Sequence, residues 1–66
     1  MQEPELKFQI YRDAAEPREW RWRLWTKNSK KIANSGEGYH NYDDCRAMVD
    51  KIIEHAKDAK VEVDKS

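Results

Sequence analysis

One stretch of the chain, residues 20–25, alternates between two kinds of side chain and limits most strongly what the chain can fold into. Successive side chains of a β-strand point to opposite faces of the sheet. One face of a strand over residues 20–26 would carry Trp20, Trp22 and Leu24. The other face would carry Arg21, Arg23 and Trp25. Alternation of this kind predicts a strand whose two faces meet different surroundings.

Two further segments predict strands. Residues 6–12 alternate in the same way and place three apolar side chains on one face: Leu6, Phe8 and Ile10. Residues 31–35 would form a third, shorter strand. The connection 13–19 contains Pro17, which cannot donate a sheet hydrogen bond, and the connection 27–30 is short and polar. Strands joined by short connections predict an antiparallel meander.

The period of the apolar pattern changes from two to about 3.6 after residue 41. Asn41 is a good N-cap, and Asp43 and Asp44 would lie in the first turn, where the helix dipole favours negative charge. Apolar side chains then recur at spacings of three and four: Cys45, Met48, Val49, Ile52, Ile53 and Ala56. We expect a helix over residues 42–57 that lays this stripe across the Trp22 face of the sheet.

These elements predict an α+β fold, a β-β-β-α unit in which a three-stranded antiparallel sheet packs on one amphipathic helix. We expect a single domain over residues 6–64 and a disordered tail over residues 1–5. The alternation of Val61-Glu62-Val63 allows a short C-terminal edge strand.

The small size of the chain favours association. A domain of 66 residues buries only about 60% of the surface that its unfolded form exposes, so its stability is marginal without help. Its single cysteine, Cys45, excludes an intramolecular disulfide, and no cluster of metal ligands stands out. Oligomerisation is the remaining common source of stability. We therefore expect a homodimer.

Charge is balanced overall but not along the chain. There are 13 basic and 13 acidic residues, yet residues 1–35 carry eight Lys/Arg against five Asp/Glu, and residues 36–66 carry five against eight. A net charge of zero argues against a general binder of polyanions. No apolar run approaches the ~20 residues of a membrane span. The acidic N-terminus lacks the apolar core of a signal peptide and the thiol is free, so we expect a cytoplasmic protein without a membrane partner.

Three motifs together resemble the YegP-like family of bacterial and archaeal domains of unknown function. They cover residues 7–64 and are Phe8-Gln9-Ile10-Tyr11-Arg12-Asp13, Arg21-Trp22-Arg23-Leu24, and Ser35-Gly36-Glu37-Gly38-Tyr39 followed by a helix with Cys45 near its start. The resemblance implies a β-β-β-α unit. Some members carry the unit twice, and single-unit members look like homodimers in which two copies reproduce the tandem arrangement. The family often has Asn-Gly where this chain has Asn28-Ser29, and the resemblance implies no activity.

The first candidate site is the face that would carry Tyr11, Arg21, Arg23 and Trp25. A sheet face with arginine and aromatic side chains can stack bases and contact phosphates, and the neighbouring Lys27, Lys30 and Lys31 would add positive charge. Arginine and tryptophan are also enriched at protein interfaces. Because zero net charge weakens the nucleic-acid interpretation, we favour an interface between two copies of the chain.

The second candidate site is the ligand loop Ser35, Gly36, Glu37, Gly38 and Tyr39, where a small molecule could bind. A lone Gly-x-Gly is a weak phosphate motif. A turn from strand into helix that needs positive φ or close backbone approach explains the two glycines more simply.

Enzymatic chemistry finds little support. Cys45 with His40 and Asp43 or Asp44 suggests a nucleophile, but Cys45 lies on the apolar stripe, and nearby carboxylates would raise the pKa of its thiol. His40 and His55 match no metal-binding spacing. We expect no catalysis, no metal and no cofactor. The leading hypothesis is a non-enzymatic interaction module that acts as a homodimer; binding of nucleic acid or of a small molecule is the alternative.

Overall fold

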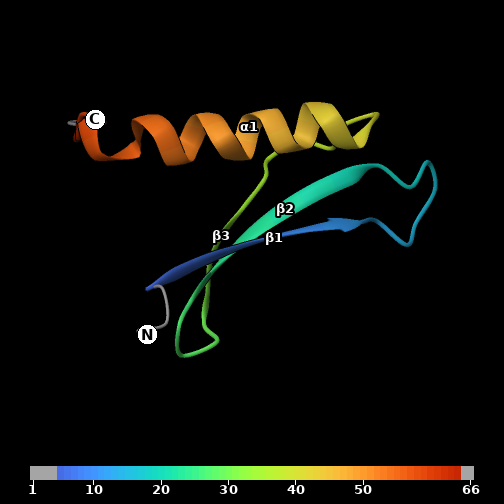
Figure 1. Cartoon of the computed structure of the whole chain (residues 1–66), viewed down its shortest axis with the longest axis horizontal. Coiled ribbons are helices and arrows are strands. Elements are labelled where there is room, and N and C mark those ends of the chain that lie inside the picture. The colour runs from blue at the N-terminus through green and yellow to red at the C-terminus, as the bar shows by residue number, and fades with distance from the viewer. Residues whose placement is uncertain (1–4, 65–66) are drawn as a thin grey trace.

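The computed structural model describes residues 5–64. They form one antiparallel sheet with a helix across one of its faces (Figure 1). Its strands, in the spatial order β1-β2-β3, are Leu6–Arg12, Trp20–Thr26 and Lys31–Asn34. Helix α1 spans Tyr42–His55, and one 3-10 turn, η1, follows at Ala56–Asp58. This confirms the predicted β-β-β-α unit, with β3 one residue shorter than expected and the α-helix ending two residues earlier. Most of the predicted tail, residues 1–4, lies outside the described residues.

The hairpin between β2 and β3 contains one left-handed residue and a bulge. Ser29, and not Asn28, has a left-handed backbone, with φ of 65°. The N–H of Thr26 donates to the carbonyl of Lys30 at 2.9 Å, which closes the turn. Trp25 pairs with Lys31 and Leu24 pairs with Ala33, so Ile32 is an extra residue, a bulge, on β3.

Helix α1 begins as its sequence predicts. The side chain of Asn41 accepts a hydrogen bond from the N–H of Asp44 at 2.9 Å, which satisfies one of the free donors of the first turn. Asp43 and Asp44 lie in that turn, where they complement the helix dipole. The predicted N-cap is therefore confirmed.

The core lies between α1 and the face of the sheet that carries Trp20, Trp22 and Leu24. Phe8 meets Trp22 edge to face at 5.5 Å between ring centroids, and Trp20 meets Tyr42 of the helix at 5.4 Å. Cys45 is fully buried and Val49 is 3% exposed. These contacts confirm the predicted division of the two strand faces.

The helix and the sheet do not stay in contact along their whole length. They lie close near the start of α1 and diverge toward its end (Figure 1). Ile53, which was expected to pack on the sheet, is 62% exposed, and that expectation is wrong. The angle between helix and sheet moves the last turn of the apolar stripe away from β1 and β2.

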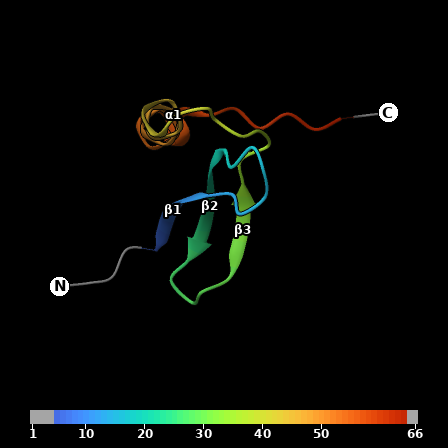
Figure 2. The ribbon, with the colours of Figure 1, turned by 90° about the vertical axis from the view of Figure 1, so that its right-hand side faces the viewer.

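The C-terminal segment leaves the body of the domain after η1 (Figure 2). Residues 59–64 form no strand, so the edge strand that the sequence allowed is not made within the described chain. Val61 is 91% exposed and Val63 is 76% exposed. Across residues 5–64, no helix is both long and apolar enough to cross a bilayer.

Candidate functional site

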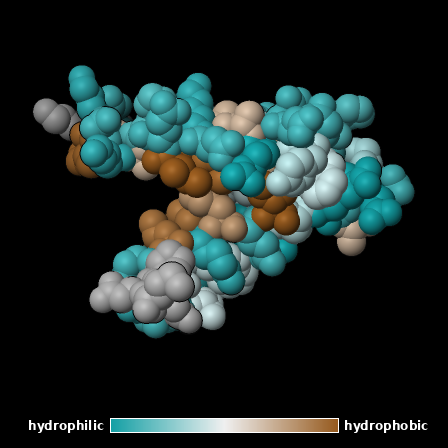
Figure 3. Space-filling view, in the orientation of Figure 1, coloured by the Kyte–Doolittle hydropathy of each residue, from teal (hydrophilic) through white to brown (hydrophobic). Residues whose placement is uncertain are grey.

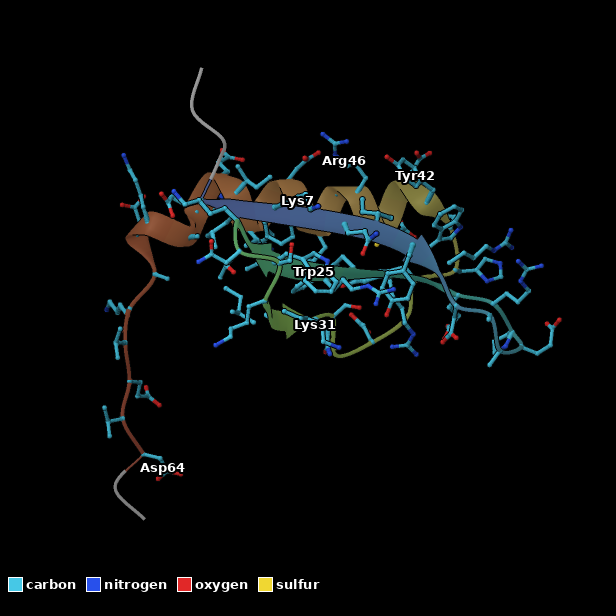
Figure 4. The ribbon with its side chains drawn as sticks, turned by 90° about the horizontal axis from the view of Figure 1, so that it is seen from below. Lys7, Trp25, Lys31, Tyr42, Arg46 and Asp64 are labelled. Carbon is cyan, nitrogen blue, oxygen red and sulfur yellow. The ribbon has the colours of Figure 1, made fainter. Side chains whose placement is uncertain are left out.

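One face of the sheet, turned away from α1, collects the residues of the first candidate site. We call it the open face; it comprises Lys7, Gln9, Tyr11, Arg21, Arg23, Trp25 and Lys31. Figure 4 labels three of these residues, Lys7, Trp25 and Lys31, one on each strand. Cross-strand pairing sets Lys7 opposite Trp25, Gln9 opposite Arg23, and Tyr11 opposite Arg21. The structure thus brings the four predicted residues together. The guanidinium of Arg23 also lies 3.7 Å from the centroid of the Tyr11 ring, a cation–π contact.

The two ends of the open face differ in charge. Arg21 forms an ion pair with Asp13 at 3.1 Å and lies 3.9 Å from the carboxylate of Glu19. The backbone N–H of Ala15 and the guanidinium of Arg21 hold the pKa of the Asp13 carboxyl below its usual value. The charge of Arg21 is therefore compensated by its own neighbours.

The other end of the open face keeps its positive charge. Lys7 and Lys31 lie on either side of Trp25 and make no ion pair with any residue of the range 5–64. The indole Nε1 of Trp25 donates to Oε1 of Gln9 at 3.2 Å. A shallow hollow of about 190 Å³ lies here, bounded by Lys7, Gln9, Trp25 and Ser29.

The sequence-based site omitted Lys7 and Gln9. Their positions in the alternation of β1 put them on the same side as Tyr11. What was missing was the strand register, which sets both residues beside Trp25 and Arg23.

An apolar groove lies on the opposite side of the sheet, where α1 diverges from it. The groove has a volume of about 600 Å³. Figure 3 shows hydrophobic surface, in brown, between the helix and the sheet. The apolar lining of the groove comes from both layers: Leu6, Phe8, Ile10 and Leu24 of the sheet, and Val49, Ile52, Ile53 and Ala56 of the helical segment. Leu6 is 50% exposed at its mouth. The groove was not predicted, because the apolar pattern alone does not report the angle between helix and sheet.

Hydrogen bonds hold the two ends of the ligand loop, Ser35 and Tyr39, to β2. Ser35 is 6% exposed; its Oγ accepts from the N–H of Trp22 at 3.3 Å, and its N–H donates to the Trp22 carbonyl at 2.8 Å. Tyr39 and Trp20 exchange two backbone hydrogen bonds of 2.8 Å each. The loop therefore continues the pairing of β2. Binding of a small molecule here stays a prediction.

The two glycines of this loop meet different conditions. Neither has positive φ, so that part of the expectation is wrong. A Cβ at Gly38 would collide with the side chain of Glu19, whereas a Cβ at Gly36 would have open space around it. Close approach thus accounts for Gly38 alone. Burial and the Glu37 carboxylate raise the pKa of the Tyr39 hydroxyl.

Cys45 is placed as a structural residue. It is completely buried on α1, and burial raises the pKa of its thiol, which keeps it in the unreactive protonated form. Among residues 5–64 no three His, Cys, Asp or Glu side chains are grouped so that they could hold a metal ion.

The native protein should therefore react slowly with a thiol reagent such as dithionitrobenzoate. We expect modification of Cys45 at about pH 8 to be at least about ten-fold slower in the native protein than in urea, because the thiol must first be exposed by opening. The chain has one cysteine, so the absorbance change reports this site alone. Equal rates in buffer and in urea would contradict the buried, structural role.

Comparison with known proteins decides the family. Residues 15–62 match the model of the family described as Domain of unknown function (DUF1508). The chain belongs to this family. It is the YegP-like family that the three sequence motifs resemble. No curated protein matches significantly.

A solved structure of similar fold supports the assignment. This structure, described as "NMR solution structure of the protein from Haloferax volcanii", is 30% identical in sequence, with a TM-score of 0.77. The match covers 91% of this chain and 97% of that one. The YegP-like assignment thus accounts for the fold and brings no activity with it, so a functional conclusion must come from the surfaces of this domain.

Proposed function

We propose that this YegP-like domain is a non-enzymatic interaction module that works as a homodimer, in which a second copy covers the apolar groove between α1 and the sheet. The observation that carries this proposal is the groove itself, about 600 Å³ in volume and lined by apolar side chains. Two of them, Leu6 and Ile53, are 50% and 62% exposed.

Apolar side chains that stay exposed in the groove contribute little to the stability of so small a domain. Burying one exposed leucine or isoleucine side chain fully stabilises by about 1.5–3 kcal/mol. Within residues 5–64, the apolar side chains that are nearly fully buried are Cys45 and Val49. Covering Leu6 and Ile53 would therefore add substantially to a core that is thin on its own.

The C-terminal segment offers a second apolar surface to the same partner. Val61 and Val63 are strongly exposed and alternate with Glu62, as in a strand that packs on one side. Strand β1, which borders the groove, is an edge of the sheet and has unpaired backbone groups. In the proposed dimer the C-terminal segment of each copy lies against the other copy.

The groove suits a symmetric contact better than the open face does. A two-fold interface sets the same patch of each copy against itself. Two open faces in contact would oppose the charges of Lys7, Arg23 and Lys31, and like charges at close range are destabilising. We therefore place the contact between copies at the groove, and not at the Arg–Trp face that the sequence favoured.

Light scattering after size exclusion tests the proposal. We expect a mass close to twice 7.9 kDa at low micromolar concentration. Ile53→Lys should weaken the dimer at least about ten-fold, because it puts a charge into the apolar contact.

Ile32→Lys is the matched control. Ile32 is the same residue type, is 50% exposed, and lies on β3 outside the groove, so its replacement should leave the dimer intact. A folded wild-type monomer at tens of micromolar concentration would refute the proposal, and so would equal loss of dimer in the two variants.

A further inference from the structure

We infer that the open face of the sheet binds single-stranded nucleic acid, with Trp25 stacking on a base and Lys7 and Lys31 contacting the phosphates on either side. The inference does not rest on the dimer, because every residue of this surface belongs to one chain and lies on the side of the sheet away from the groove.

A row of three residues crosses the open face of the sheet. Lys7 of β1 pairs with Trp25 of β2, and Trp25 pairs in turn with Lys31 of β3. The three residues lie one beside the next across β1, β2 and β3 when the sheet is seen from below (Figure 4). Neither lysine is compensated by an acidic residue of the range 5–64. An aromatic ring between two free cations matches the alternation of base and phosphate along a single strand.

A hollow lies beside the Trp25 ring. It is bounded by Lys7, Gln9, Trp25 and Ser29 and has a volume of about 190 Å³, room for one flat aromatic ring or a phosphate group. The hydrogen bond of 3.2 Å from Trp25 Nε1 to Gln9 holds the indole in one orientation. A ring that is already held loses little conformational entropy when a base stacks on it.

Arg23 offers a second flat surface, two residues before Trp25 on β2. Arg23 lies over the Tyr11 ring at 3.7 Å, and a guanidinium plane stacked in this way can itself stack on a base. Arg23 has no carboxylate partner among residues 5–64. Bases at Trp25 and at Arg23 would lie two strand residues apart, roughly 7 Å.

The net charge of zero does not exclude binding of nucleic acid at this surface, because the acidic residues lie on other parts of the domain. Asp13 and Glu19 compensate Arg21 at the far end of the face. Asp43 and Asp44 belong to the first turn of α1, on the other side of the sheet. The cationic end of the open face is therefore local, and bound nucleic acid should lie at the Trp25 end.

A single strand fits this face better than a duplex or an acidic protein. Unpaired bases can turn toward an aromatic side chain, whereas the bases of a duplex are stacked inside it. Carboxylates on a protein could pair with the lysines but would make no use of Trp25 and of the Arg23–Tyr11 stack.

Fluorescence anisotropy with labelled oligothymidylate and oligouridylate in low salt tests the inference. Trp25→Ala should weaken binding about 5- to 150-fold, the range that stacking of one base supplies. The double variant Lys7→Gln/Lys31→Gln should lower the slope of log affinity against log salt by about 0.7 for each phosphate that the protein no longer neutralises. Lys51→Gln/Lys57→Gln is the matched control, since both lysines are exposed on the helical layer, and it should bind like the wild type.

Three results would overturn the inference. They are no binding of either oligonucleotide at low salt, equal or tighter binding of polyglutamate or of a duplex, and equal weakening by the control pair. Circular dichroism establishes that each variant is folded. If Trp25→Ala does not fold, Trp25→Phe should retain most of the affinity, and the lysine variants decide the outcome.

Discussion

Trp22→Ala should leave the domain largely unfolded at room temperature. Truncation of a tryptophan in a core costs about 3–5 kcal/mol. A domain of 66 residues has a total stability of about 3–10 kcal/mol at roughly 0.05–0.15 kcal/mol per residue, so the loss is most of what is available. The ring of Trp22 packs on Phe8, and its backbone holds Ser35 through two hydrogen bonds. Urea titration followed by far-UV circular dichroism measures the effect.

Trp25→Ala is the control for this variant. It removes the same side chain three residues along the same strand, but from the open face, where no helix covers it. We expect a loss of about 1 kcal/mol. Equal losses for the two tryptophans would show that the two faces of β2 do not differ as the structure has them.

Val49→Lys should have an effect of similar size. Val49 is 3% exposed at the point where α1 meets the sheet, and a lysine there would bury an unpaired ammonium group. An uncompensated buried charge costs about 3–5 kcal/mol, which is enough to unfold a small domain. Thermal unfolding followed by circular dichroism should show either no cooperative transition or one far below that of the wild type.

Ala47→Lys is the matched control for the helix. Ala47 is an exposed residue of α1, two positions before Val49 and outside the groove, so lysine there keeps its charge in water. Its melting temperature should stay close to that of the wild type, since surface substitutions on a helix cost little. A folded Val49→Lys with an unchanged transition would refute the packing of α1 described above.

Much of the fold could be predicted because the signals are local. The alternation of residues 20–26 divides Trp22 from Trp25 whatever the rest of the chain does, since the side-chain period of a strand is two. The start of α1 depends on one hydrogen bond between Asn41 and Asp44, three residues apart.

The parts that could not be predicted depend on several elements at once. The neighbours of Trp25 depend on the registers of two strand pairs and on the bulge at Ile32. The left-handed residue of the hairpin is Ser29, a residue type with weaker preference for that conformation than the adjacent Asn28. Glycine is needed at position 38 because a Cβ there would collide with the side chain of Glu19, and only the folded chain brings these two residues together.

Local patterns in the chain were enough to predict which residues form strands and helix, and which side of β2 belongs to the core. Those properties follow from periodicity and capping over a few neighbouring residues. The packing of the whole domain is needed to see that α1 diverges from the sheet, leaves Ile53 exposed, and opens an apolar groove opposite the Arg23–Trp25 face. The angle between helix and sheet is the joint result of many side-chain contacts, and no local pattern in the chain records it.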